Sequence, residues 1–165
     1  QFGPAIWQPF LAPALDARDS TGRGVSLDQF RGRNVILVFY LGAGCAHCVL
    51  QVKDLSERAE RWKTLDAEVI AVSTDTVQSN ARSQPSLNVR LLSDPDVANA
   101  RRFKSYDDFE EMPIHATILI DKTGRVHWGR HGGGPFTDYE FLVSQLQRMN
   151  AMQPPAVTSS PAAQR

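Results

Sequence analysis

Short runs of apolar and mostly β-branched residues recur along the chain, each bounded by turn residues. Such runs are typical of buried strands. The last two are separated by the turn sequence DKTG, so we expect them to pair as an antiparallel hairpin. The five predicted strands are residues 34–40 (NVILVFY), 68–73 (EVIAVS), 89–93 (VRLLS), 116–121 (ATILID) and 125–130 (RVHWGR).

Three other segments have the pattern of helices. Residues 49–65 repeat apolar side chains every three or four positions, with charged side chains on the opposite side, which predicts one amphipathic helix. Residues 93–103 begin with SDPDV, where Asp94 can cap a helix and Pro95 can take its first position. Thr137 opens a capping-box sequence, TDYE, ahead of a stripe of apolar residues.

The alternation of strands and helices predicts an α/β fold, with a central mixed β-sheet flanked by helices. The length of 165 residues and the 42% share of hydrophobic residues suit a single core. We assign this domain to residues 12–150, with an N-terminal extension over residues 1–11. Residues 151–165 are rich in Pro, Ser and Ala without any period, which predicts a disordered tail or a linker.

Charge and hydropathy argue against several classes of partner. Lys plus Arg balance Asp plus Glu at 18 each, so the net charge does not favour nucleic acid or an anionic membrane surface. Apolar runs are too short to cross a bilayer, so we expect no membrane insertion. The chain starts at Gln1 instead of Met, which leaves open a removed leader or excision from a longer protein. The compartment therefore stays undecided.

Both cysteines of the chain lie in residues 41–49, LGAGCAHCV, directly after the first predicted strand. Cys48 falls where this strand gives way to a helix. The unpaired N–H groups of the first helical turn are therefore expected to stabilise its thiolate. Cys45, three residues earlier, can attack a sulfenic acid or a mixed disulfide on Cys48 and act as the resolving thiol. The spacing favours redox chemistry over a structural staple, because a bridge across so short a gap adds little stability.

Two other interpretations of the cysteines stay open. They could be inert thiols in a core, or they could bind copper or zinc together with His47 or His115. For His47 we prefer a solvent-facing position or a modest positive charge near a thiolate. The glycine-rich segment at residues 131–135, HGGGP, is expected to be a flexible connection between a strand and a helix.

The chain resembles the peroxiredoxins of the alkyl hydroperoxide reductase/thiol-specific antioxidant (AhpC/TSA) family over residues 12–149. The segments that carry the resemblance are the entry segment APALDARDSTGRGVSLDQFRGRNVILVFY, then VIAVSTD, LLSDPD and ATILIDKTGRV, in this order and spacing. The resemblance implies a thioredoxin-like fold with an N-terminal β-hairpin. It also implies a thiol-dependent antioxidant peroxidase that needs no cofactor, acts on hydroperoxides and is regenerated by a thioredoxin-like dithiol.

The same resemblance assigns positions in the active-site loop. Cys48 lies nine residues after Phe39 and takes the place of the family's peroxidatic cysteine. Cys45 takes the place of its threonine, Leu41 that of its proline, and His115 that of an arginine that helps to hold the peroxide. A thiol is a weak hydrogen-bond donor and histidine is often neutral, so these changes remove donors that polarise the peroxide bond.

These departures leave three functions open. The first is reduction of hydroperoxides through Cys48, with Cys45 as the resolving thiol. The second is thiol-disulfide exchange with protein disulfides, because Cys45 converts the loop into a C-x-x-C pair. The third is a metal-binding (copper or zinc) or redox-sensing module of a larger protein. His115 can serve as a proton acceptor, as a metal ligand, or simply as a side chain that fills space.

Overall fold

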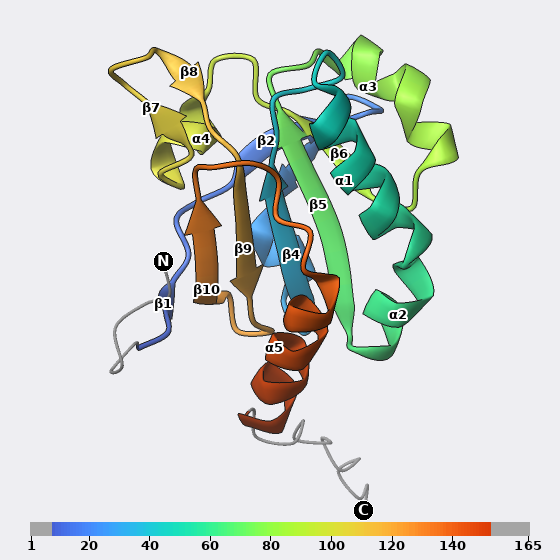
Figure 1. Cartoon of the computed structure of the whole chain (residues 1–165), viewed down its shortest axis with the longest axis vertical. Helices are drawn as coiled ribbons and strands as arrows, with labels where there is room; N and C mark the ends of the chain where they lie inside the picture. The colour runs from blue at the N-terminus through green and yellow to red at the C-terminus, as the bar shows by residue number, and fades with distance from the viewer. Residues whose placement is uncertain (1–7, 153–165) are drawn as a thin grey trace, which may run out of the picture.

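The computed structural model describes residues 8–152, which form one eight-stranded sheet with helices on both of its faces (Figure 1). The strand order is β1-β10-β9-β4-β5-β6-β2-β3, in which β4, β5 and β6 are parallel and the other neighbours are antiparallel. The strands of this sheet are β1 (Phe10–Leu11), β2 (Asp16–Asp19), β3 (Gly24–Ser26), β4 (Asn34–Phe39), β5 (Ala67–Ser73), β6 (Arg90–Ser93), β9 (Ala116–Ile120) and β10 (Arg125–His131).

The helices divide between the two faces of the sheet. One core cluster packs α1, α2 and α5 against the sheet, and a second cluster on the opposite face includes side chains of η1 and α4. A separate two-stranded hairpin, β7 (Tyr106–Asp107) and β8 (Met112–Pro113), precedes β9. The helices are η1 (Leu27–Phe30), α1 (Ala46–Glu57), α2 (Ala59–Thr64), α3 (Val77–Ser83), η2 (Gln84–Ser86), α4 (Ala98–Arg102) and α5 (Tyr139–Met152).

The continuous apolar runs form the middle of the sheet, as the sequence predicts. All six residues of β4 are buried. Its side chains alternate between the two cores, so that Ile36 and Val38 face the α1 side while Leu37 and Phe39 face the other. A parallel strand covered on both faces has to be apolar at nearly every position. The predicted α/β fold, with its mixed sheet flanked by helices, is confirmed.

Two hairpins that the sequence predicts are also present. Strands β9 and β10 pair as antiparallel neighbours around the turn at residues 121–124. Strands β2 and β3 form the N-terminal hairpin, and β2 adds it to the sheet by pairing with β6. Strand β1 lies within the predicted N-terminal extension and pairs with β10. Most of the predicted tail, residues 153–165, lies outside the described residues.

The single helix predicted over residues 49–65 is wrong, because α1 and α2 are separate. The break occurs at Arg58, whose backbone leaves the helical region with φ −94° and ψ 15°. The Trp62 indole N–H donates to the Leu55 carbonyl at 2.9 Å. Trp62 is buried, so its N–H needs an acceptor inside the protein. The carbonyl that accepts it lies beside the break in the helix.

Both predicted helix starts need correction. Helix α4 begins at Ala98, and Pro95 is not in its first turn. Asp94 nevertheless caps the helix from a distance, since its carboxylate accepts the N–H groups of Asn99 and Ala100 at 3.1 and 2.9 Å. At α5 the side chain that accepts is Asp138 rather than Thr137, because its carboxylate bonds the Phe141 N–H at 3.0 Å.

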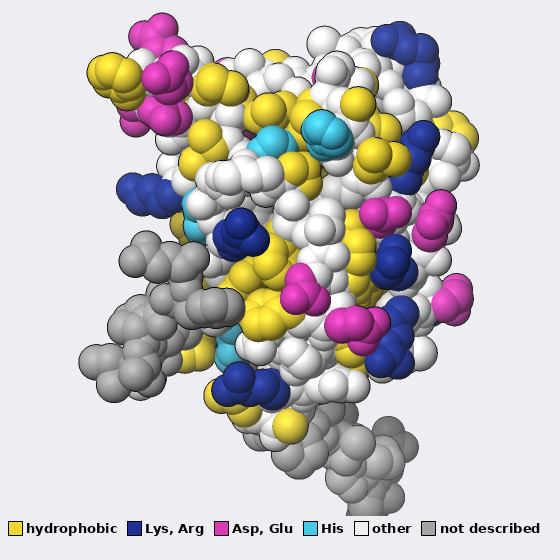
Figure 2. All heavy atoms as spheres, viewed as in Figure 1, with side chains coloured by type: hydrophobic (Ala, Val, Ile, Leu, Met, Phe, Trp, Pro, Cys, Tyr) yellow, Lys and Arg dark blue, Asp and Glu magenta, His cyan; other side chains and the backbone are white. Residues whose placement is uncertain are grey.

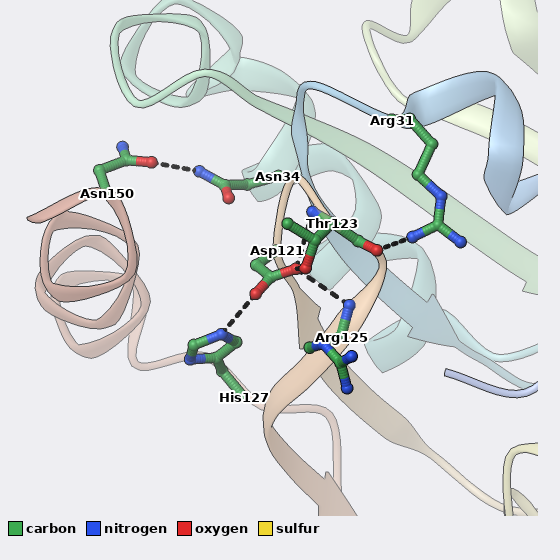
Figure 3. A network of polar contacts seen from close by, with 7 residues as sticks. All are labelled: Arg31, Asn34, Asp121, Thr123, Arg125, His127 and Asn150. Atoms are coloured by element: carbon green, nitrogen blue, oxygen red, sulfur yellow. Dashed lines mark hydrogen bonds and ion pairs between the residues drawn. The ribbon is translucent and has the colours of Figure 1, made fainter. Parts of the chain in front are cut away.

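Polar contacts fix the end of the sheet where α5 finishes (Figure 3). The Asp121 carboxylate accepts the Thr123 hydroxyl at 2.7 Å and the Arg125 N–H at 2.9 Å, and it lies 2.7 Å from His127 Nε2. The Asn34 side chain donates to Asn150 Oδ1 at 2.7 Å, which ties β4 to α5. No helix within residues 8–152 has the length and apolar character needed to cross a membrane.

Candidate active site

The segment from the end of β4 to the first turn of α1 carries both cysteines, and Gly42 and Asp75 shape its loop. Gly42 has φ +93°, a conformation that residues with a Cβ rarely adopt. A Cβ at this position would also lie 2.8 Å from Asp75 Oδ1. The Asp75 carboxylate accepts the Ala43 N–H at 2.8 Å. The segment that follows β5 therefore holds the loop that leads into α1.

Cys45 and Cys48 form a disulfide, with their Cα atoms 5.3 Å apart. Cys48 lies in the first turn of α1 and is 0% exposed, whereas Cys45, which precedes the helix, is partly exposed. The Cys48 backbone N–H points to Cys45 Sγ, 3.4 Å away. The sequence predicts that the helix N–H groups stabilise the sulfur of Cys48. In the structure the N–H contact is instead made to Cys45.

The sulfur of Cys48 contacts the ring of His115, a residue far from it in the sequence. His115 directly precedes β9, and its Nε2 lies 2.8 Å from Cys48 Sγ. Its Nδ1 lies 3.1 Å from the Gly133 carbonyl. A carbonyl only accepts, so Nδ1 carries a proton, and Nε2 is the ring atom that faces the Cys48 sulfur. Each sulfur of the pair thus has a different polar neighbour, the Cys48 N–H for Cys45 and the His115 ring for Cys48.

The glycine-rich segment that follows β10 is part of the site. Gly132 and Gly133 have φ +79° and +71°, and the Gly132 N–H donates to the His115 carbonyl at 2.8 Å. Two hydrogen bonds therefore join this loop to His115, one to its ring and one to its backbone. The segment connects β10 to α5, as predicted, and at these two residues it is hydrogen-bonded to His115. Consecutive glycines are the signal in the sequence that such a left-handed turn is possible.

Gln51 anchors the same loop to α1, one turn after Cys48. Its Nε2 donates to the Phe136 carbonyl at 2.9 Å and lies 3.3 Å from the Thr117 hydroxyl. Phe136 also contacts the Trp128 ring, with centroids 4.9 Å apart. Gln51 could not be singled out from the sequence, because nothing in a helical sequence shows whether one of its polar residues is buried. Here it is 2% exposed and fixes the loop that holds His115.

His47 lies away from this arrangement. It is exposed on the first turn of α1, and its side chain makes no hydrogen bond or ion pair with any residue between 8 and 152. The donor atoms that lie within 4.8 Å of one another belong to Cys45, Cys48 and His115. Figure 2 shows histidine side chains among hydrophobic ones at the end of the molecule where α1 begins. Of the two histidines proposed, the structure brings His115 to the sulfurs.

Two further ionisable side chains remain uncharged around neutral pH: Tyr40, which directly follows β4, and His131, which ends β10. Burial raises the pKa of Tyr40, although the contact with Ser73 opposes it. Burial lowers the pKa of His131, although its bond to the Phe103 carbonyl opposes this. Neither Tyr40 nor His131 therefore carries a charge near pH 7.

Comparison with known proteins identifies the family. The model of the AhpC/TSA family matches residues 11–128, most of the chain. The chain belongs to the AhpC/TSA family. It is 32% identical over 120 residues to the chloroplastic peroxiredoxin Q of Oryza sativa subsp. japonica, covering 71% of this chain and 55% of that protein. It is 28% identical over 128 residues to peroxiredoxin Bcp of Escherichia coli K12, covering 70% of this chain and 80% of that protein.

Solved structures have the same fold. The bacterioferritin comigratory protein of Xanthomonas campestris superimposes with a TM-score of 0.75 and 18% identity, covering 86% of this chain and 98% of that one. Peroxidoxin BcpB of Mycobacterium tuberculosis gives a TM-score of 0.74 and 21% identity, covering 88% and 97% of the two chains. The predicted thioredoxin-like fold, peroxiredoxin family and enzyme class, a thiol-dependent peroxidase, are confirmed.

Proposed function

We propose that this AhpC/TSA protein reduces hydroperoxides with Cys48 as the attacking thiolate, Cys45 as the resolving thiol and His115 as the proton donor. The observation that carries the proposal is the 2.8 Å contact between His115 Nε2 and Cys48 Sγ. An imidazolium beside a thiol lowers the thiol's pKa and increases the fraction of nucleophilic thiolate. Family membership supports a hydroperoxide as the substrate.

The first step transfers one oxygen atom. The Cys48 thiolate attacks the terminal oxygen of the hydroperoxide, the O–O bond breaks, and the organic oxygen leaves as an alkoxide. His115 Nε2 is placed to give this alkoxide its proton, so the products are an alcohol and a sulfenic acid on Cys48. The Gly133 carbonyl keeps the ring oriented by accepting from Nδ1. His115 therefore supplies a donor in place of the family's arginine.

The second step closes the disulfide seen in the structure. The Cys45 sulfur attacks the Cys48 sulfenic acid, the S–O bond breaks, and hydroxide leaves as water after taking a proton. Cys45 needs its own thiolate for this attack. The Cys48 N–H, 3.4 Å from Cys45 Sγ, favours that thiolate. The Cα separation of 5.3 Å lets the bond form without rearranging the helix start.

Regeneration requires an external dithiol, which we propose is thioredoxin-like. Its thiolate attacks Cys45, because Cys48 is 0% exposed while Cys45 is partly exposed. The S–S bond breaks, and Cys48 leaves as a thiolate stabilised by His115. A second thiol of the reductant then releases Cys45. The same partly exposed sulfur favours a second candidate function, in which the reduced pair exchanges with protein disulfides.

Steady-state peroxide consumption tests the proposed function. The reduced protein is supplied with hydrogen peroxide or an alkyl hydroperoxide and a thioredoxin system, and wild type is compared with Cys48→Ser. We expect turnover in wild type and none above background in the variant. Reduction of a protein disulfide such as insulin, measured in parallel, separates the two functions. Disulfide reduction without peroxide turnover would contradict the peroxidase and support the second candidate.

A further inference from the structure

We propose that the reduced protein binds one thiophilic d10 cation, Cu(I) or Zn(II), through Cys45 Sγ, Cys48 Sγ and His115 Nε2. These three atoms lie within 4.8 Å of one another. Donor atoms around a zinc ion with Zn–S bonds of about 2.3 Å and Zn–N bonds of about 2.0–2.1 Å lie roughly 3.5–3.8 Å apart. Once their bond is reduced, the two sulfurs have to separate to about 3.8 Å, and Cys48 Sγ and His115 Nε2, now 2.8 Å apart, to about 3.5 Å.

The environment of His115 favours a metal ligand. A histidine that binds a metal through one ring nitrogen commonly donates its other N–H to a carbonyl, which fixes the tautomer and the ring's direction. His115 Nδ1 makes this contact with the Gly133 carbonyl at 3.1 Å. Nε2 is thereby presented toward the sulfurs with its lone pair. The carbonyl is itself fixed, because Gly132 bonds back to His115 at 2.8 Å.

The donor set determines the class of ion. Two thiolates and one imidazole are soft or borderline ligands, which select Cu(I) and Zn(II) over Mg²⁺ or Ca²⁺. Cu(I) is satisfied by the three donors. Zn(II) needs a fourth, and water can approach from the partly exposed side of Cys45. Binding uses both sulfurs as thiolates, releases the protons that they still carry and transfers no electrons, so it requires a reduced pair and a metal already in these oxidation states.

Metal binding and the disulfide exclude each other, because both use the same two sulfurs. The inference uses the site of the proposed peroxidase but does not depend on that activity. A protein that binds the metal without reducing peroxide would retain this inference and lose the proposed function. A protein that reduces peroxide without binding the metal would retain the proposed function and lose this inference. The two proposals therefore fail separately.

Competition titration tests the site directly. Reduced protein, free of chelator and under argon, is titrated with zinc in one arm and with Cu(I) in the other, each against a chromophoric chelator. We expect one ion per chain in at least one arm and none bound by the oxidised protein. X-ray absorption of the loaded protein should show two sulfur and one nitrogen ligands. A reduced wild type that binds neither ion would overturn the proposal.

Matched histidine variants assign the third ligand. His115→Gln should weaken binding by at least about tenfold and remove the nitrogen ligand. His47→Gln, whose side chain is exposed, should bind as wild type. Two titratable thiols and a wild-type circular dichroism spectrum establish that His115→Gln is folded and reduced. Equal affinity of both variants, or loss confined to His47→Gln, would contradict the assignment of His115.

Discussion

The backbone N–H of Cys48, in the first turn of α1, points to the sulfur of Cys45, which lies 3.4 Å away at the residue that caps the helix. The helix start therefore acts on Cys45, and the sulfur of Cys48 depends on His115, which lies 67 residues further along the chain. In this arrangement the two sulfurs of a C-x-x-C pair are controlled separately. Substitutions can therefore change one sulfur without the other.

Replacing His115 tests the control of Cys48. We expect His115→Gln to lower the second-order rate constant for oxidation by hydrogen peroxide about 100-fold, because a positioned proton donor contributes roughly 10²–10⁴ in rate. Stopped-flow measurement of the reduced proteins gives the constants. His127→Gln is a suitable control, since this histidine bonds Asp121 at the other end of β9. A His115→Gln rate within twofold of wild type would show that the ring only fills space.

The turn that holds His115 offers a matched pair of glycines. Gly133 has φ +71°, so Gly133→Ala should cost about 1–2 kcal/mol of unfolding free energy or shift the carbonyl that orients the ring. Either change should lower the peroxide rate several-fold. Gly134 is not in the left-handed region, and a Cβ there would meet nothing within 4 Å. Gly134→Ala should behave as wild type in denaturant titration and in rate. Equal effects of the two substitutions would argue against a role for the turn.

The reductant is expected to attack Cys45. A thioredoxin that keeps only its attacking cysteine should trap a mixed disulfide with the oxidised protein, because the second thiol that releases it is missing. Fragmentation mass spectrometry can locate the bond within residues 45–48. We expect it at Cys45, which is partly exposed, and not at Cys48, which is 0% exposed. Trapping at Cys48 would require the helix start to open first and would contradict the proposed order of regeneration.

The free energy of unfolding is expected to fall in acid as the Asp121 carboxylate becomes protonated. Burial alone would raise the pKa of Asp121, but hydrogen bonds from Thr123, Arg125 and His127 hold it below its ordinary value. The stabilisation is therefore complete above the unfolded-state pKa near 4 and is lost as pH falls through the lower folded pKa. We expect Asp121→Asn to be less stable at pH 7, by about 1–3 kcal/mol, with a flatter pH dependence below pH 4.

Urea titrations between pH 2 and 7 measure this dependence. Asp28→Asn serves as the control, because the Asp28 side chain is 82% exposed in its ion pair with Arg31. It should leave the pH profile unchanged. Parallel profiles for wild type and Asp121→Asn would contradict the prediction.

The strands could be predicted because continuous apolar runs are what a sheet buried on both faces requires, as in β4. The break at Arg58 could not, because it lies where the buried Trp62 finds its acceptor, which is a tertiary contact. The helix start at Ala98 was missed for a similar reason. Asp94 caps it across intervening residues, one of which, Val97, has φ +54°.

The cysteines of the site were predictable from their spacing, and His115 from its place in the family pattern. Its partner, the Gly133 carbonyl, was not, because every residue offers a backbone carbonyl and only the folded loop selects one. Gln51 and Asp75 were missed because polar residues gain their roles here through burial and through contacts with distant backbone groups. The side chains proposed to do the chemistry were therefore easier to predict than the groups that position them.

Single-turnover oxidation of the reduced protein by hydrogen peroxide tests the central claim, that Cys48 attacks the peroxide and Cys45 resolves it. Stopped-flow traces of wild type, Cys45→Ser and Cys48→Ser are followed by dimedone labelling and mass spectrometry. We predict rapid disulfide formation in wild type, a rapid reaction that ends in a dimedone-reactive sulfenic acid on Cys48 in Cys45→Ser, and no rapid phase in Cys48→Ser. A rapid phase that survives in Cys48→Ser, with the label on Cys45, would contradict the account.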